Sequence, residues 1–195
     1  MIQDFDRSGY FGGSDTKYVM AKNRDTKSWR RWWNIKTGEE EGGLVGTVYT
    51  RAGNLYEHPI LKSIDEDMRL DGQIIYEKYL LRVNYDGWKD GTIYECKTHR
   101  ANKEFKVTKE YWQQCQLEMY VYDKMHSNWF LPPLKELYLV SYPLADSEYE
   151  VDEAVIYPER ITMQKIPYEK DWVKSEYLPR VKELARYLKK GKSPV

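Results

Sequence analysis

The chain has few cysteines and no long apolar stretch. Cys96 and Cys115 are the two cysteines of its 195 residues, too few for a disulfide framework or for an iron–sulfur cluster held by four cysteines. Sparse cysteine is typical of proteins in a reducing cytoplasm, where we expect this one. The N-terminal segment MIQDFDRSGY lacks the apolar core of a secretion signal, and no run reaches the length of a membrane span. We therefore expect no membrane association.

The chain also lacks an excess of charge of either sign. Its 31 basic and 31 acidic residues give a formal net charge of zero, so contact with a nucleic acid would need a local basic patch. A glycine-rich nucleotide-binding loop is missing too, since the Gly12-Gly13 pair is too short for one. This makes a small-molecule enzyme the weakest functional interpretation. The length fits one domain, residues 1–195, with a substantial core.

Aromatic residues are abundant, with 18 tyrosines and 7 tryptophans. The segment DTKSWRRWWNIK, residues 25–36, places Trp29, Trp32 and Trp33 among basic residues. Aromatic rings interleaved with cations suit stacking on nucleic-acid bases and contact with phosphates. A helix here would also bring the same rings onto one face for ordinary core packing. The sequence leaves both interpretations open.

The stretch LRVNYDGWKDGTIYECKT, residues 81–98, carries the most informative pattern. Two short apolar runs flank an Asp-Gly pair, which predicts a β-hairpin. Glu95 and Lys97 are two residues apart and share one face of the second strand, and Asp86 lies on the first. Two acids and a lysine suit metal-assisted hydrolysis, with the carboxylates holding Mg²⁺ and Lys97 positioning or deprotonating the attacking water. The alternative is the solvated charged face of an edge hairpin.

A second informative segment is TKEYWQQCQLEMYVYDKM, residues 108–125, which predicts a helix capped by Thr108. Gln114 follows Tyr111 by three residues and Gln116 precedes Tyr120 by four, so the two residues of each pair lie on the same face of the helix. The other expected helices are one capped by Ser14 or Asp15, one over 25–36, one over 45–64 that is interrupted at Pro59, and one over 169–190, which Pro179 should kink or divide by starting a new helix after a break. The expected strands lie over 73–83 and 134–142 and within 153–166.

This order of motifs resembles the PD-(D/E)XK nuclease superfamily, and within it the phage recombination exonucleases of the lambda-exonuclease and YqaJ-like viral recombinase type. The resemblance implies an α/β (α+β) fold with a restriction-endonuclease-like core, in which helices flank a central mixed β-sheet. One departure is Tyr85, which stands before Asp86 where the motif name has proline.

The resemblance also implies roles for individual residues. Lys97, Glu95, Asp86 and Gln114 would be catalytic, and the metal ligands would be Glu57, Asp86, Glu95 and the backbone carbonyl of Cys96. Gln116 with Tyr120 fits a related form of the glutamine motif, so the register of that motif stays open. Arg7 and Ser14 would bind the DNA 5′-phosphate. Further residues that could contact DNA are Trp32, Arg31, Arg100, Gln116 and Tyr120.

By the same resemblance, the activity would be a Mg²⁺-dependent deoxyribonuclease, with Mn²⁺ as a possible substitute and one or two ions per site. We expect a 5′→3′ exonuclease on linear duplex DNA that leaves 3′ single-stranded tails for the annealing protein of a recombination system. A ring-shaped homo-oligomer, for example a trimer, is expected, in the host cytoplasm if a phage encodes the chain. The alternatives are a single-strand-specific or structure-specific nuclease and a non-catalytic nucleic-acid-binding protein.

Overall fold

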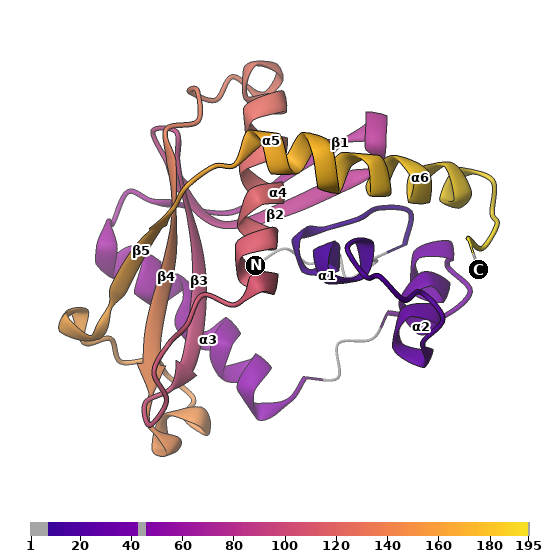
Figure 1. The fold of residues 1–195 in the computed structure, drawn as a ribbon. Coiled ribbons are helices and arrows are strands. Elements are labelled where there is room, and N and C mark those ends of the chain that lie inside the picture. Colours follow the sequence, from indigo (N-terminus) through magenta and orange to yellow (C-terminus); the bar gives the residue numbers. More distant parts are fainter. Residues whose placement is uncertain (1–7, 43–45, 195) are drawn as a thin grey trace.

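A five-stranded mixed sheet forms the centre of the protein (Figure 1). The computed structural model describes residues 8–42 and 46–194. The strands follow one another across the sheet in chain order, and only the β3–β4 pair is parallel. A parallel pair needs a crossover, which the long helix α4 supplies between β3 and β4. The strands are β1 Arg69–Tyr76, β2 Leu81–Lys89, β3 Thr92–Arg100, β4 Glu136–Leu144 and β5 Thr162–Ile166.

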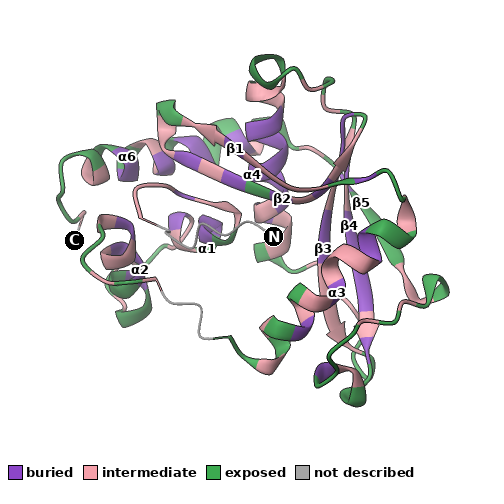
Figure 2. Ribbon diagram, turned by 180° about the vertical axis from the view of Figure 1, so that it is seen from behind, coloured by how far each residue is buried: buried purple, intermediate pink, exposed green. Residues whose placement is uncertain are grey.

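Helices cover both faces of the sheet, and α3 and α4 lie on opposite faces (Figures 1 and 2). This confirms the predicted fold class, a mixed sheet flanked by helices. The single-domain prediction for residues 1–195 stays a prediction. No helix within 8–42 and 46–194 is long and apolar enough to cross a membrane. The α-helices are α1 Thr16–Val19, α2 Lys27–Thr37, α3 Val48–Ile64, α4 Lys109–Met125, α5 Lys170–Trp172 and α6 Leu178–Lys189.

The core has two parts, one on each face of the sheet. The larger part joins the sheet to α4, α6 and the tryptophans of α2, and includes Trp33, Leu117 and Val181. The smaller part lies under α3 and includes Tyr56, Cys96 and Tyr142. Buried residues therefore concentrate on the central strands and on α4, as Figure 2 shows. Helices lie on both sides of β3, so they can bring side chains to this strand from two directions.

Two predicted elements differ from the structure, and a third takes one of its two expected forms. Helix α3 continues through Pro59, because burial of its apolar face, including Tyr56 and Ile60, outweighs the cost of one proline. The strand expected over 73–83 is two strands, since the chain turns at Glu77–Tyr79. The helix expected over 169–190 is divided by a π-helical turn, Val173–Tyr177, and Pro179 lies in the first turn of the following helix α6, which is the second of the two outcomes expected at this proline.

Candidate active site

The hairpin of β2 and β3 opens where the candidate site begins. Its paired register runs from Lys89 and Thr92 at the turn to Gly87 and Tyr94. Asp86 and Glu95 are the next residues on the two strands, so they lie where the strands separate. Oδ2 of Asp86 accepts a 2.8 Å hydrogen bond from the backbone N–H of Cys96. The side chain of Asp86 thus takes the place of a backbone acceptor on the neighbouring strand. Side chains from both α3 and α4 can reach the opening.

Glu95 is the centre of the contacts on the α4 side. It is 2% exposed, and its Oε1 accepts hydrogen bonds from Nζ of Lys97 and, at 2.5 Å, from Nε2 of Gln114. Both donors use the same oxygen, which leaves Oε2 available to a metal ion. Lys97 also lies over the ring of Tyr111, 5.5 Å from its centroid. The structure therefore brings together three of the four predicted catalytic residues by direct contact.

Negative charge accumulates around this opening. Burial, followed by the charge of Glu95, raises the pKa of Glu57 to about 7. Burial and the charges of Glu95 and Glu57 raise the pKa of Asp86 well above its ordinary value. Burial works against the charge of Lys97, but the carboxylates of Glu95 and Asp86 outweigh it and raise the pKa of Lys97. Lys97 is therefore an ammonium ion at neutral pH, and it is the nearest positive charge available to several carboxylates.

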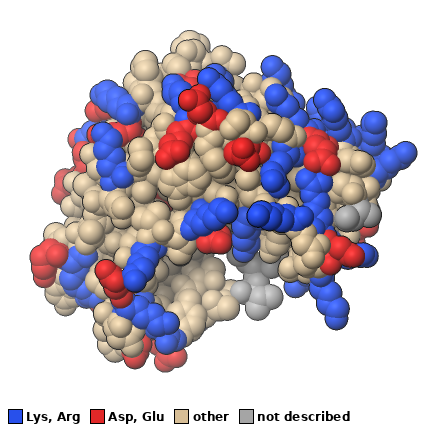
Figure 3. Space-filling model, viewed as in Figure 1, with Lys and Arg blue, Asp and Glu red and all other residues tan. Residues whose placement is uncertain are grey.

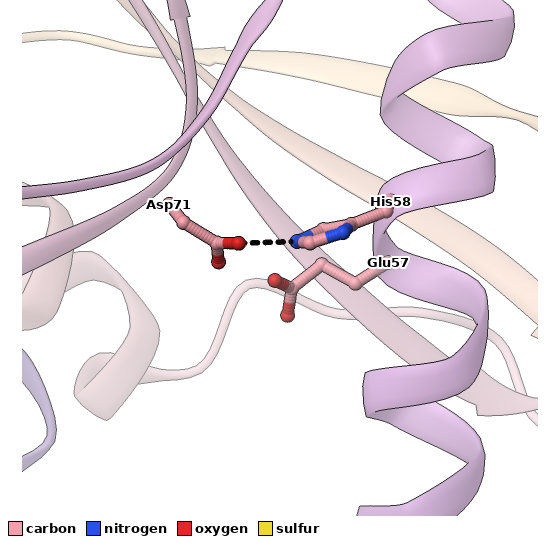
Figure 4. Close-up of side chains that lie close together, drawn as sticks. All are labelled: Glu57, His58 and Asp71. Atoms are coloured by element: carbon pink, nitrogen blue, oxygen red, sulfur yellow. Dashed lines mark ion pairs between the residues drawn. The ribbon is translucent and has the colours of Figure 1, made fainter. Parts of the chain in front are cut away.

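Metal-ligating side chains also meet on the α3 side of the opening. Donor atoms of Glu57, His58 and Asp71 all lie within 4.8 Å of one another, the one such group of three among the described residues (Figure 4). Nε2 of His58 lies 3.0 Å from Oδ2 of Asp71. Asp71 has a positive φ of 56°, and the register between β1 and β2 omits Asp71 and Asp86, which stand opposite each other. The ligand atoms of the predicted set, Glu57, Asp86 and Glu95, do not all lie within 4.8 Å of one another.

The donor set nevertheless fits a divalent cation. Three carboxylates, those of Glu57, Asp86 and Glu95, interact with the single ammonium group of Lys97, and a divalent cation would compensate their surplus negative charge. Asp86 and Glu95 each keep one oxygen that is not used in the hydrogen bonds described above. Hard carboxylate oxygens of this kind are the ligands that Mg²⁺ and Mn²⁺ prefer.

The predicted 5′-phosphate residues lie partly outside the described residues. Arg7 is outside them, and Ser14 is exposed in the short 3-10 turn Gly13–Asp15. Asp15 holds this turn in place, because its buried carboxylate accepts bonds from the N–H of Gly12 at 2.7 Å and from Nε1 of Trp32 at 2.7 Å, and pairs with Nζ of Lys36 at 2.6 Å. Asp15 occupies the N-cap position of α1, as expected, but its side chain makes no capping bond to this helix and instead accepts from the N–H of Gly12.

The same turn lies against α4. A Cβ added to Gly13 would stand 2.9 Å from Cγ of Gln114 and 3.1 Å from Oε1 of Glu118. Ser14, the next residue, is thereby close to the glutamine that contacts Glu95. The turn and the opened hairpin thus belong to one region of the molecule.

Three of the predicted DNA contacts are wrong because their side chains are buried. Trp32 is 5% exposed and its ring packs with Trp29, Trp33 and Tyr18. Tyr120 is 5% exposed within the core. Gln116 is fully buried; its Nε2 donates to the carbonyl of Pro167 and its Oε1 accepts from the N–H of Glu169. Of the two candidate glutamines, Gln114 is the one whose side chain contacts Glu95.

Two predicted contacts are accessible. Arg31 is exposed on α2 and pairs with Glu40 at 2.7 Å. Arg100, at the end of β3, lies 5.0 Å from the ring centroid of Tyr49 on α3 and donates to its hydroxyl. On the face shown in Figure 3, basic and acidic side chains are interspersed, and basic side chains border a hollow between the surface over α3 and the surface over α2. Because the net charge of the chain is zero, a DNA-binding surface would have to be a local patch of basic side chains.

Sequence reasoning missed several residues around the opening. Glu118 follows Gln114 by one helical turn, and this spacing was available as a signal. His58 and Asp71 carried no such signal, because a single histidine in a helix and an aspartate near the beginning of a strand are common. The Asp15–Lys36 pair joins segments 21 residues apart, so only the folded chain brings it together.

Comparison with known proteins identifies the fold. No protein-family model matches the chain, and no curated protein matches it in sequence. The chain is similar to the solved alkaline exonuclease LHK-Exo of Laribacter hongkongensis, with 17% identity, 93% of this chain and 92% of that chain covered, and a TM-score of 0.60. It is similar to a phage-related exonuclease of Haemophilus somnus 129PT, with 13% identity, 93% and 94% coverage, and a TM-score of 0.65.

A complex of LHK-Exo with dAMP matches similarly, with 17% identity, 93% and 89% coverage and a TM-score of 0.64. The matches extend over nearly the whole of both chains. The chain therefore has the fold of the alkaline and phage-related exonucleases.

Proposed function

We propose that the protein is a metal-dependent DNA exonuclease. The observation that carries this proposal is the contact of Glu95 with both Lys97 and Gln114 at the opening of the hairpin. It occurs on a fold shared with solved exonucleases. A solvated edge hairpin, the alternative for this motif, does not account for a glutamate that is 2% exposed.

The metal ligands in this proposal are Glu57, Asp86, Glu95 and the carbonyl of Cys96, with one or two Mg²⁺ or Mn²⁺ ions. His58 and Asp71 lie beside Glu57 and extend the donor set. A bound divalent cation would stabilise the negative charge that develops on the phosphate and on the leaving oxygen.

The other residues act on the water and the phosphate. Lys97, which contacts Oε1 of Glu95, would orient or deprotonate the attacking water and compensate phosphate charge. Gln114 holds Oε1 of Glu95 and so leaves Oε2 facing a cation. Tyr111 packs against the ammonium group of Lys97 and restricts its movement.

The proposed substrate is linear duplex DNA, degraded from the 5′ end to leave 3′ single-stranded tails. A mononucleotide occupies the solved complex of LHK-Exo. In this chain the exposed Ser14, in a turn that packs against Gln114, is a suitable place for a terminal phosphate, with Arg7 as its expected partner. The proposal extends to a ring-shaped homo-oligomer, to a cytoplasmic location and to cooperation with a strand-annealing protein.

The structure argues against a single-strand-specific nuclease, because the tryptophans expected to stack on unpaired bases are buried. Trp29, Trp32 and Trp33 are 1%, 5% and 3% exposed, so unpaired bases cannot stack on them. A non-catalytic DNA-binding protein would have no need for a buried glutamate that contacts both a lysine and a glutamine.

The test uses a 5′-phosphorylated linear duplex labelled at either end, incubated with Mg²⁺. We expect the wild type to release 5′ mononucleotides from the 5′ end and Lys97→Met to release none above background. Lys89→Met is the matched control, since Lys89 lies on the same hairpin but pairs with Asp65 at the end near the turn. Folded wild-type protein that cleaves neither duplex nor single strands with Mg²⁺ or Mn²⁺ would reject the proposal. Release from the 3′ end would reject the proposed polarity.

A further inference from the structure

A fully buried carboxyl group lies directly behind the candidate site. Glu118 on α4 is 0% exposed. Its Oε1 accepts a 2.9 Å hydrogen bond from Nε2 of Gln114, and the same Nε2 donates to Oε1 of Glu95. Glu118 thus joins the site through Gln114 and has no role in the proposed reaction described so far.

These two bonds determine how the Gln114 amide is oriented. An amide nitrogen has two N–H groups, and here one points to Glu95 and the other to Glu118. The reversed amide would place its carbonyl oxygen between two carboxyl oxygens and lose both bonds. Glu118 therefore fixes the amide with its nitrogen toward Glu95, and the carbonyl oxygen of Gln114 remains as an acceptor on its other side.

Glu118 is a costly residue at this position if its role is only to fill space. Its Oε2 is buried without a hydrogen-bond partner among the described residues, and its neighbours Leu117 and Met119 are buried apolar residues of the core. Burial, with the charges of Glu95 and Asp86, raises the pKa of Glu118 well above its ordinary value. Its Oε1 accepts the bond from Gln114, and this contact is what the position offers beyond filling space.

The turn before α1 closes over the same pair of residues. Gly13 leaves no room for a side chain beside Gln114 and Glu118, and the bonds of Asp15 fix the position of the turn. Gln114 is consequently confined by Glu95, Glu118 and Gly13, and its amide has little freedom except to reverse.

We propose that Glu118 is a positioning residue of the nuclease site, which orients the Gln114 amide so that it donates to Glu95 and keeps that carboxylate in its metal-binding position. This inference rests on the proposed function, because it assigns Glu118 to the same site. It adds a residue that touches neither DNA nor metal and acts only through Gln114.

The test is a double-mutant cycle on Gln114→Met and Glu118→Met, with Glu118→Gln as the conservative variant. Methionine keeps the shape but removes the acceptor, whereas glutamine keeps both the shape and an acceptor oxygen. Gln116→Met is the matched control, since Gln116 is equally buried on α4 but bonds to Pro167 and Glu169. Two quantities are measured for each variant: kcat and KM for duplex degradation with Mg²⁺, and the Kd of Mn²⁺ without DNA by calorimetry.

We expect Glu118→Met to lower kcat about tenfold, the effect of losing one hydrogen bond behind a metal ligand, with KM for DNA unchanged. In the Gln114→Met background the same substitution should change kcat less than about twofold, because residues that act through one contact are not additive. Glu118→Gln and Gln116→Met should stay within about twofold of wild type. The Kd of Mn²⁺ should follow the same pattern.

Equal effects of Glu118→Met in both backgrounds would overturn the inference, since Glu118 would then act independently of Gln114. A large loss of kcat in Glu118→Gln would overturn it too. If the wild type cleaves no DNA, the proposed function fails, and the Mn²⁺ affinities alone decide whether Glu118 positions Gln114. If the wild type cleaves and the cycle is additive, only the role of Glu118 fails.

Discussion

The crowding of carboxylates at the hairpin opening should make Glu57 destabilising in the absence of metal. We consider the substitution Glu57→Gln, which removes one negative charge and keeps the shape. Glu57 is partly buried, and this burial together with the charge of Glu95 raises its pKa to about 7. In the unfolded chain a glutamate has its ordinary pKa of 4.5. The folded protein therefore binds more protons than the unfolded chain between these values, and the free energy of unfolding falls as pH rises through this window.

The size of the effect follows from the two pKa values. A difference of about 2.5 units corresponds to about 3 kcal/mol of lost stability above pH 7, from about 1.4 kcal/mol per unit. At pH 5 Glu57 is mostly protonated in the folded state, so the loss is below about 1 kcal/mol. Glu57→Gln should therefore unfold at higher urea concentration than wild type at pH 8 and at nearly the same concentration at pH 5.

Urea denaturation with a metal chelator at the two pH values measures this difference. The control is Glu66→Gln, just after α3, whose side chain is exposed; it should change stability by less than about 0.5 kcal/mol. Saturating Mg²⁺ should stabilise the wild type and not Glu57→Gln, because a ligand that binds the folded state raises its stability. Equal stability of wild type and Glu57→Gln at pH 8 without metal would refute the reasoning.

Three further substitutions test the structure around the site. Trp32→Phe removes the indole donor from Oδ1 of the buried Asp15 and should cost about 1–3 kcal/mol in urea denaturation, with unchanged DNA affinity by fluorescence anisotropy; a weaker affinity would show that the ring does reach DNA. Gly13→Ala places a methyl group 2.9 Å from Cγ of Gln114. This should displace Gln114 and lower kcat, measured by an activity assay, while the thermal midpoint, measured by thermal unfolding, changes little. Gly91→Ala, at a φ of 87° with a Cβ only 2.2 Å from a carbonyl oxygen of the loop before β4, should lower the thermal midpoint by several degrees, and an unchanged midpoint would contradict the hairpin geometry.

Local signals in the sequence were enough to predict the hairpin and the central helix. Asp90 and Gly91 have positive φ values, as their pairing at a tight turn predicted. Thr108 caps α4 through a bond from the N–H of Tyr111, as its position before the apolar pattern indicated. Both features are determined by residues that are close together in the chain, so they can be predicted from one sequence.

Features that depend on distant contacts were not predictable in the same way. Gln114 and Gln116 lie about 200° apart around a helix, and only the packing of α4 decides which of them points to Glu95. Trp32 lies at a helical spacing from Trp29 that fits a core and a stacking surface equally well. Its burial depends on packing against Phe11 and Tyr18 and on the bond to Asp15, and no local pattern connects these residues with it.

The burial of α4 has a consequence for how the protein can move. Residues 115–122 are buried without interruption, so more than two turns of the helix face protein on every side. Backbone amides of such a segment exchange with solvent only when the whole domain opens. Gln114, at the edge of this segment, is therefore anchored to the slowest-exchanging part of the molecule, whereas the first turn of α3 carries the exposed Tyr49. Adjustment to a substrate must accordingly come from the α3 side, and hydrogen exchange should slow there, not in α4, when DNA binds.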